Sequence, residues 1–120
     1  MNQRRILVAY DGTEEAYWAL MHATEAAHAN DAAIGVVTVL PSLATAAGDA
    51  AAILREHELE PSVHTPVGDP ATEITRVAEE HAYDAIYVGR RDHGTLARAL
   101  EQSVSEGVIQ TSSRTTVIAR

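Results

Sequence analysis

The 120-residue sequence contains no cysteine, no lysine and no phenylalanine. Without cysteine it cannot form a disulfide, a thiolate zinc site, a thiol nucleophile or a cysteine-bound iron–sulfur cluster. Without lysine it lacks the Gly-Lys-Ser/Thr ending of a Walker A phosphate loop and the amine of a Schiff-base enzyme. Every apolar run falls short of the ~18 residues that a transmembrane helix needs, and the N-terminus shows no signal-peptide pattern. We therefore expect a cytoplasmic protein with no membrane partner.

Negative charge dominates the composition. Seventeen aspartates and glutamates stand against nine arginines, which gives a net charge of −8 at neutral pH. Such a surface repels phosphate, and no basic stripe interrupts it, so we expect no nucleic-acid partner. An acidic composition without lysine fits both a halophile and a GC-rich genome, and the sequence does not choose between them.

Short, nearly continuous apolar runs alternate with segments of helical periodicity along the chain. The runs predict strands buried on both faces, which is typical of a parallel sheet. Their order predicts a single α/β domain over residues 1–120, doubly wound, with a five-stranded parallel sheet and helices on both faces. The expected strands are 6–10, 33–40, 60–67, 84–89 and 115–119, and the expected helices are 13–29, 42–58, 70–81 and 103–111. Two prolines, Pro61 and Pro66, favour an edge position for the third strand.

Two strand ends carry residues suited to a binding site. In a doubly wound sheet, ligands bind beyond the carboxyl ends of the strands, where the strand order reverses. The first predicted strand ends in Asp11-Gly12-Thr13 and the fourth in Gly89, so both would open on one crevice if these strands are neighbours. Ser103 and Glu106 match a capping box, which would begin a helix whose free N–H groups attract an anion. Alternatively, Ser103 only caps that helix.

Five segments, in order, resemble the universal stress protein family. They are Ile6–Thr13, Val67–Ala71, Ala82–Gly89, the residues Leu96, Arg98, Leu100, Ser103 and Val104 at the family spacing, and Thr116–Ala119. The resemblance covers essentially the whole chain, although the segment between the second and third strands is shorter than is typical. It implies a sheet order of 3-2-1-4-5, which places the first and fourth strands side by side. It also implies a homodimer formed through the last strand, 115–119, whose apolar edge favours pairing with a second copy.

ATP-binding members of that family carry the pattern Gly-x2-Gly-x9-Gly-Ser/Thr after the fourth strand. In this chain Gly89 and Ser103 match the pattern, whereas Asp92 and Gln102 replace its second and third glycines. Such glycines let the backbone approach the phosphates and adopt positive φ, and Asp92 adds a charge that repels them. The resemblance therefore implies a degenerate adenine-nucleotide site, at which ATP or AMP binds weakly or not at all.

The adenosine half of the implied site is better kept. Asp11, Val39 and Val88 occupy positions that contact the base and ribose in ATP-binding members, and Val104 follows Ser103 at the family spacing. Alternatively, Asp11 only caps or turns the chain after the first strand, and both valines belong to the core of the sheet. The sequence alone does not choose between these interpretations.

Other candidate residues form weaker patterns. The six histidines are not at metal-ligand spacing, and His57-Glu58-Leu59-Glu60-Pro61 does not match His-Glu-x-x-His, so we expect no metal site. Ser103, Asp11 and His93 lack a nucleophile-elbow signature, so we expect no catalytic triad. Trp18 falls opposite the alanine stripe of the first helix, where it either anchors an unknown protein partner or is an ordinary surface side chain.

The sequence thus predicts a non-catalytic universal stress protein that acts as a small dimeric regulatory module. The alternative interpretation is a genuine ATP- or AMP-binding stress sensor whose loop tolerates Asp92 and Gln102. A nucleotide hydrolase or transferase is a third, for which analogy of fold is only a weak argument.

Overall fold

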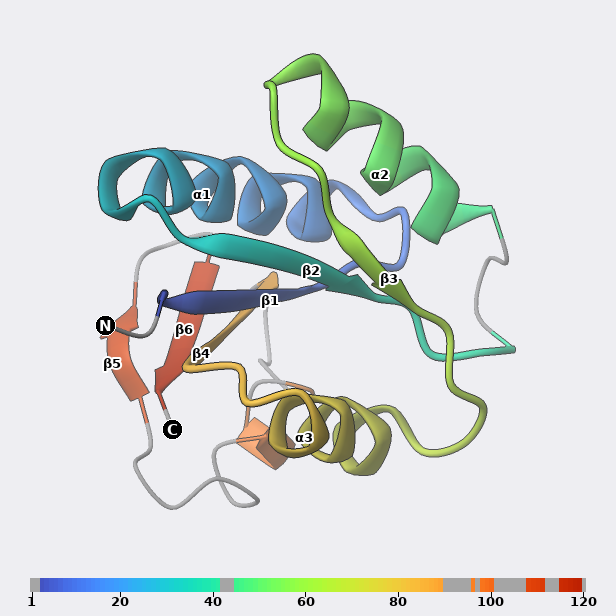
Figure 1. The fold of residues 1–120 in the computed structure, drawn as a ribbon. Helices are drawn as coiled ribbons and strands as arrows, with labels where there is room; N and C mark the ends of the chain where they lie inside the picture. Colours follow the sequence, from blue (N-terminus) through green and yellow to red (C-terminus); the bar gives the residue numbers. More distant parts are fainter. Residues whose placement is uncertain are drawn as a thin grey trace.

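The computed structural model describes residues 3–41, 45–89, 96, 98–100, 108–111 and 115–119. These residues form a sheet with helices on both of its faces (Figure 1). In chain order the elements are β1 (Arg5–Ala9), α1 (Glu14–Asn30), β2 (Ala33–Val37), α2 (Ala46–Glu56), β3 (Ser62–His64), α3 (Pro70–Glu80), β4 (Ala85–Gly89), β5 (Val108–Thr111) and β6 (Thr115–Ala119). A further helical turn includes residues 98–100.

The sheet has six strands in the order β3-β2-β1-β4-β6-β5. β1 pairs in parallel with both β2 and β4, and β2 pairs in parallel with β3. This arrangement confirms the predicted α/β fold, with the strands at 85–89 and 115–119 following β1 in the predicted order. Continuous apolar runs form the central strands because both faces of the sheet are covered, so neither face of β1 meets water.

The C-terminal part of the sheet differs from the prediction in two ways. Residues 108–111 form a strand rather than the end of the helix predicted over 103–111, and β6 runs antiparallel to both β4 and β5. β-branched residues dominate Val108–Thr111, which favours a strand. Three residues connect β5 to β6, and a connection that short suits an antiparallel pair, whereas a parallel pair needs a crossover of a dozen or more residues. The capping box at Ser103 and Glu106 lies outside the described residues.

The two edges of the sheet are therefore β3 and β5. The prediction that the last strand forms an edge is wrong, because β6 lies between β4 and β5. The prediction that the third strand forms the opposite edge is confirmed. β3 is only three residues long, and the flanking Pro61 and Pro66 explain its shortness because proline lacks the N–H that a strand ladder needs.

Two hydrophobic clusters hold the layers together. α1 and α2 pack on one face, where their alanines contact Ile6 and Val8 of β1. α3 packs on the other face, where Ile74 contributes to a cluster with Leu7 and Ile86. Alternation along β1 sends successive side chains to opposite faces. The site predicted at the carboxyl ends of the strands thus lies between the α1–α2 layer and the α3 layer (Figure 1).

Candidate functional site

The predicted site lies at the carboxyl ends of the two central strands, β1 and β4. β1 and β4 are adjacent parallel strands, with Ile6 opposite Ala85 and Val8 opposite Tyr87. β2 lies on the other side of β1, so the strand order reverses between β1 and β4. Asp11 and Gly89 therefore follow neighbouring carboxyl ends, as predicted, at the position where doubly wound sheets bind ligands.

Asp11 organises the turn that begins α1. Its carboxylate Oδ1 accepts hydrogen bonds from the Thr13 backbone N–H at 3.1 Å and from the Thr13 hydroxyl at 2.6 Å. The same Thr13 hydroxyl accepts the Ala16 N–H at 3.2 Å and so caps the helix. Gly12 has φ of 85°, which glycine adopts without strain. These bonds support the interpretation that Asp11 turns the chain after the first strand, with Thr13 as the helix cap, and the contact of Asp11 with a ribose stays a prediction.

Gly89 is pressed against the first turn of α1. A Cβ atom at this position would lie 2.5 Å from the carbonyl carbon and oxygen of Glu15 and 2.7 Å from the amide nitrogen of Ala16. These are backbone atoms, which cannot rotate away as the end of a flexible side chain can. Glycine is therefore required here by the packing of the helix on β4, whether or not a phosphate binds nearby.

Val39 and Val88 are both buried on the α3 side of the sheet. Their side chains are 8 % and 2 % exposed and belong to the cluster that contains Ile74, Val77 and Leu100. This placement supports the interpretation that both valines are core residues. Contact of either valine with an adenine base stays a prediction.

Tyr10 connects the ends of β1 and β2 on the α1–α2 side. Its N–H donates to the Val37 carbonyl at 2.9 Å, and its carbonyl accepts the Thr38 hydroxyl at 2.7 Å. Burial raises the pKa of the Tyr10 phenol, and the nearby carboxylates of Asp49 and Asp11 raise it further. Two negative charges therefore lie near the carboxyl end of β1, and a ligand phosphate placed there would meet the same two carboxylates.

Asp49 is a residue that the sequence reasoning missed. It occupies the first turn of α2, where an acidic residue is favourable to the helix dipole and so attracts no attention in the sequence. Only the packing of α2 beside β2 brings its charge to Tyr10. Nothing in the local sequence pattern signals that proximity.

The phosphate end of the predicted site lies outside the described residues. Ser103 and Val104 fall there, as do Asp92 and Gln102 at the two replaced glycine positions. Between them, Leu100 is fully buried in the α3-side cluster. The chain beyond Gly89 thus returns to the core on the α3 side of the sheet.

The other predicted features can be placed only in part. Among the described residues, no group of three or more histidine, aspartate or glutamate side chains could hold a metal ion. In the described part of the chain, no helix is both long and apolar enough to cross a membrane. Trp18 is 37 % exposed on α1, and its ring meets that of Tyr17 edge-on at 5.8 Å between centroids. A protein partner at this pair stays a prediction.

Comparisons with known proteins place these features in context. The model of a family described as the universal stress protein family matches residues 2–61 and 43–120. The two matches overlap at residues 43–61, which include α2. A comparison with the sequences of curated proteins found no match.

Solved structures resemble the fold along most of its length. A universal stress protein from Archaeoglobus fulgidus is 26% identical, with a TM-score of 0.73 over 88% of this chain and 90% of that one. A universal stress protein from the same organism in complex with dAMP is 23% identical, with a TM-score of 0.73 over 87% and 93% of the two chains. A universal stress protein in complex with cAMP is 19% identical, with a TM-score of 0.61 over 70% of each chain.

Proposed function

Because this chain belongs to the universal stress protein family, we propose that it is a small, non-catalytic member whose adenine-nucleotide site is degenerate. It acts as a dimeric regulatory module in the cytoplasm, and it binds ATP weakly or not at all. Universal stress proteins are in general not enzymes, which supports the first part of the proposal. The state of the phosphate loop supports the second.

The packing of Gly89 carries the proposal of a degenerate site. Of the three glycines in the ATP-binding pattern, Gly89 is the one that this chain keeps. The backbone of Glu15 and Ala16 already requires a glycine at that position. Its presence is therefore explained without a nucleotide, and the sequence replaces the other two glycines of the pattern with Asp92 and Gln102.

Electrostatics support the same proposal. The charges of Asp49 and Asp11 both raise the pKa of the Tyr10 phenol, which supports a negatively charged carboxyl end of β1. Asp92 and Glu101 add two further carboxylates to the loop where phosphates would bind, against Arg90, Arg91 and Arg98. A triphosphate is therefore opposed more strongly than a monophosphate, because each phosphate adds negative charge to the same neighbourhood.

Two of the similar structures support adenine nucleotides as the ligand class to test. They are complexes with dAMP and cAMP, each of which has a single phosphate. In this chain the adenosine positions Asp11, Val39 and Val88 are kept. We therefore expect the loss of affinity, relative to an intact site, to be smaller for AMP than for ATP.

Titration with a fluorescent ATP analogue, with and without magnesium, tests the proposal. We expect a dissociation constant weaker than ~100 μM, or about −5.5 kcal/mol, because the chain lacks two glycines that would let the backbone come close to the phosphates. Tight binding would instead establish a nucleotide sensor. Turnover of ATP in a parallel assay for phosphate or pyrophosphate release would establish an enzyme.

We also propose that the chain forms a homodimer, and that the β5–β6 hairpin provides the interface. The sequence predicts a homodimer through an exposed last strand. That argument does not apply, because β5 covers the edge of β6. β5 now presents that edge, and an uncovered edge strand favours pairing with another chain. The opposite edge, β3, is short and flanked by Pro61 and Pro66, which makes it the poorer of the two for pairing. A two-fold axis would let β5 pair with its own copy.

Light scattering at micromolar concentration should give about twice the 12.8 kDa chain mass. The variant Ile109→Pro should be monomeric, because a proline in the edge strand β5 disfavours its pairing with a second chain, and Ile109 is not one of the residues paired with β6. Circular dichroism checks that this variant is folded. Val117→Lys is unsuitable, because Val117 is 3 % exposed and its replacement would disturb the core. A monomeric wild-type chain contradicts the homodimer, and a dimeric Ile109→Pro variant moves the interface away from β5.

A further inference from the structure

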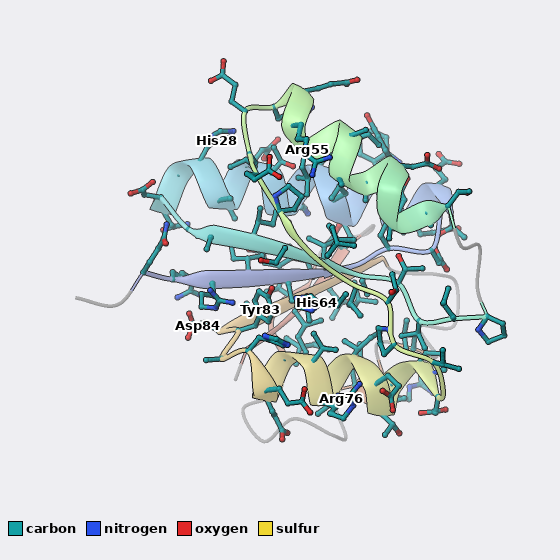
Figure 2. All side chains as sticks on the ribbon, turned by 45° about the vertical axis from the view of Figure 1, so that its right-hand side comes forward. His28, Arg55, His64, Arg76, Tyr83 and Asp84 are labelled. Atoms are coloured by element: carbon teal, nitrogen blue, oxygen red, sulfur yellow. The ribbon has the colours of Figure 1, made fainter. Side chains whose placement is uncertain are left out.

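Tyr83 lies across the α3-side face of the sheet and reaches the edge strand. It stands in the turn between α3 and β4, is 2 % exposed, and occupies the space above Gly35 in β2, where a Cβ atom would overlap the Tyr83 hydroxyl. That hydroxyl is 2.9 Å from Nε2 of His64, the last residue of β3. Figure 2 shows Tyr83 and His64 close together between the sheet and α3. A single aromatic side chain thus ties β3 to the rest of the fold.

A second histidine and an arginine complete this cluster. The ring of His81, which ends α3, lies 4.5 Å from the His64 ring between centroids, with the planes tilted by 44°. The Arg5 guanidinium carbon lies 4.8 Å from the centre of the Tyr83 ring, and Arg5 Nε donates to the His81 carbonyl at 2.8 Å. Three elements, β1, β3 and α3, therefore meet around Tyr83.

Burial and two neighbouring charged groups, His81 and Arg5, oppose the protonation of His64. His81 approaches from the end of α3 and Arg5 from β1, while Tyr83 and Ser62 present hydroxyl groups. Burial lowers the pKa of His64, and the charges of His81 and Arg5 lower it further. The carboxylate of Asp84, beside Tyr83 in the chain, accepts a hydrogen bond from the Arg5 backbone N–H at 2.8 Å.

The direction of this shift fixes the direction of the pH effect. A histidine in the unfolded chain has a pKa near 6.5, and the folded His64 has a lower one. Between the two values the unfolded chain binds more protons, so stability falls as the pH falls through that window. The contribution of neutral His64 to the stability of the fold is complete above about pH 6.5, and it is lost as the pH falls through the lower pKa that His64 has in the folded chain.

β3 is the element that gives way most easily. It has three residues and pairs only with β2 among the described strands, and two of its side chains, Ser62 and Val63, are exposed. The backbone beyond it holds the end of β2, because the Thr38 N–H donates to the His64 carbonyl at 3.0 Å and the Leu40 N–H to the Pro66 carbonyl at 2.8 Å. Val39 stands between these two donors. Elements with few buried contacts open first in a native protein.

We propose that the adjacent His64–His81 pair, held by Tyr83 and Arg5, is an acid-sensitive latch for the edge strand β3. At neutral pH the neutral His64 keeps β3 on Tyr83. On acidification His64 gains charge beside His81 and Arg5, β3 opens locally, and the segment that carries Val39 loses the hydrogen bonds that the Thr38 and Leu40 N–H groups donate to the His64 and Pro66 carbonyls. The opening itself does not depend on a nucleotide; its effect on ligand binding, through Val39, rests on the proposed function.

Amide hydrogen exchange resolved by residue tests the latch without any nucleotide. The protection of the Thr38 and Leu40 amides, corrected for intrinsic rates and divided by that of the β1 amides, should fall about threefold or more from about pH 7.5 to about pH 5.5. The β1 amides serve as the reference for global stability. A ratio that does not change with pH overturns the proposal.

Three variants separate His64 from the other histidines. His64→Gln, which keeps a polar group for Tyr83 and cannot gain charge, should make the ratio independent of pH. His81→Gln changes an exposed side chain, so it should fold even where His64→Gln does not, and it should weaken the pH response by removing a neighbouring charge. His57→Gln, an exposed histidine at the end of α2, should leave the response intact. A full response in a folded His64→Gln variant, or in His81→Gln, contradicts the latch, as does the loss of the response in His57→Gln.

Discussion

Replacing Gly89 with alanine should lower the free energy of unfolding by about 3 kcal/mol, because the new methyl group would overlap the α1 backbone. The Cβ atom would lie 2.5 Å from the carbonyl carbon and oxygen of Glu15, so α1 must shift away from β4. α1 carries Ala16, Ala19 and Leu20 into the core, and that shift would loosen all three contacts. Urea unfolding followed by the fluorescence of Trp18, the single tryptophan, measures the change.

Gly48→Ala is the matched control for this measurement. It is the same chemical change in the first turns of α2, and a Cβ atom there would meet nothing within 4 Å. We expect it to be neutral or to stabilise by up to about 1 kcal/mol, because alanine is the better helix former. If Gly89→Ala unfolds like the wild-type chain, packing does not explain Gly89. The glycine would then count as evidence for a phosphate site, and the main support for a degenerate site would be lost.

The central part of the fold could be predicted because its signals are local. The runs at Ile6–Tyr10 and Ala85–Gly89 carry no charged residue, which is typical of strands buried on both faces. Pro61 and Pro66 likewise placed β3 at an edge. The C-terminal segment was harder, since Val108–Thr111 carries strand-forming residues directly after a capping signal for a helix at Ser103 and Glu106. The signals conflict there, and pairing with β6 decides in favour of a strand.

The site was predictable in position and less so in chemistry. Parallel strands β1 and β4 bring Asp11 and Gly89 to one edge, as their order required. The sequence could not show that Gly89 is demanded by Glu15, because the two residues are 74 positions apart and meet only through helix packing. The same applies to Arg5, whose partners His81 and Asp84 are 76 and 79 positions away. Close approaches of this kind leave no periodic pattern.

Restoring the two replaced glycines should strengthen ATP binding substantially. In the double variant Asp92→Gly/Gln102→Gly, we expect a gain of ~1–3 kcal/mol, or about 5- to 150-fold in the dissociation constant, if the changes recover charge-assisted backbone contacts and remove a repulsion. AMP should gain less, because it brings a single phosphate to the loop. Isothermal titration calorimetry with ATP and AMP, in parallel on both proteins, measures the two gains.

Two controls separate the causes of such a gain. Asp92→Asn removes the charge without supplying a glycine, so it should recover only the part of the affinity that repulsion costs.

Asp31→Gly replaces an aspartate with glycine at the end of α1, where Asp31 has φ of 50° and glycine is tolerated. Asp31 precedes β2 and so lies at the opposite end of the sheet from Asp11. This variant should leave ATP binding unchanged, because it alters the net charge but not the loop. If Asp31→Gly gains as much as the double variant, the effect is one of net charge. If the double variant gains nothing, the loop does not limit binding, and the Asp49 carboxylate near Tyr10 becomes the next group to test for exclusion of the triphosphate.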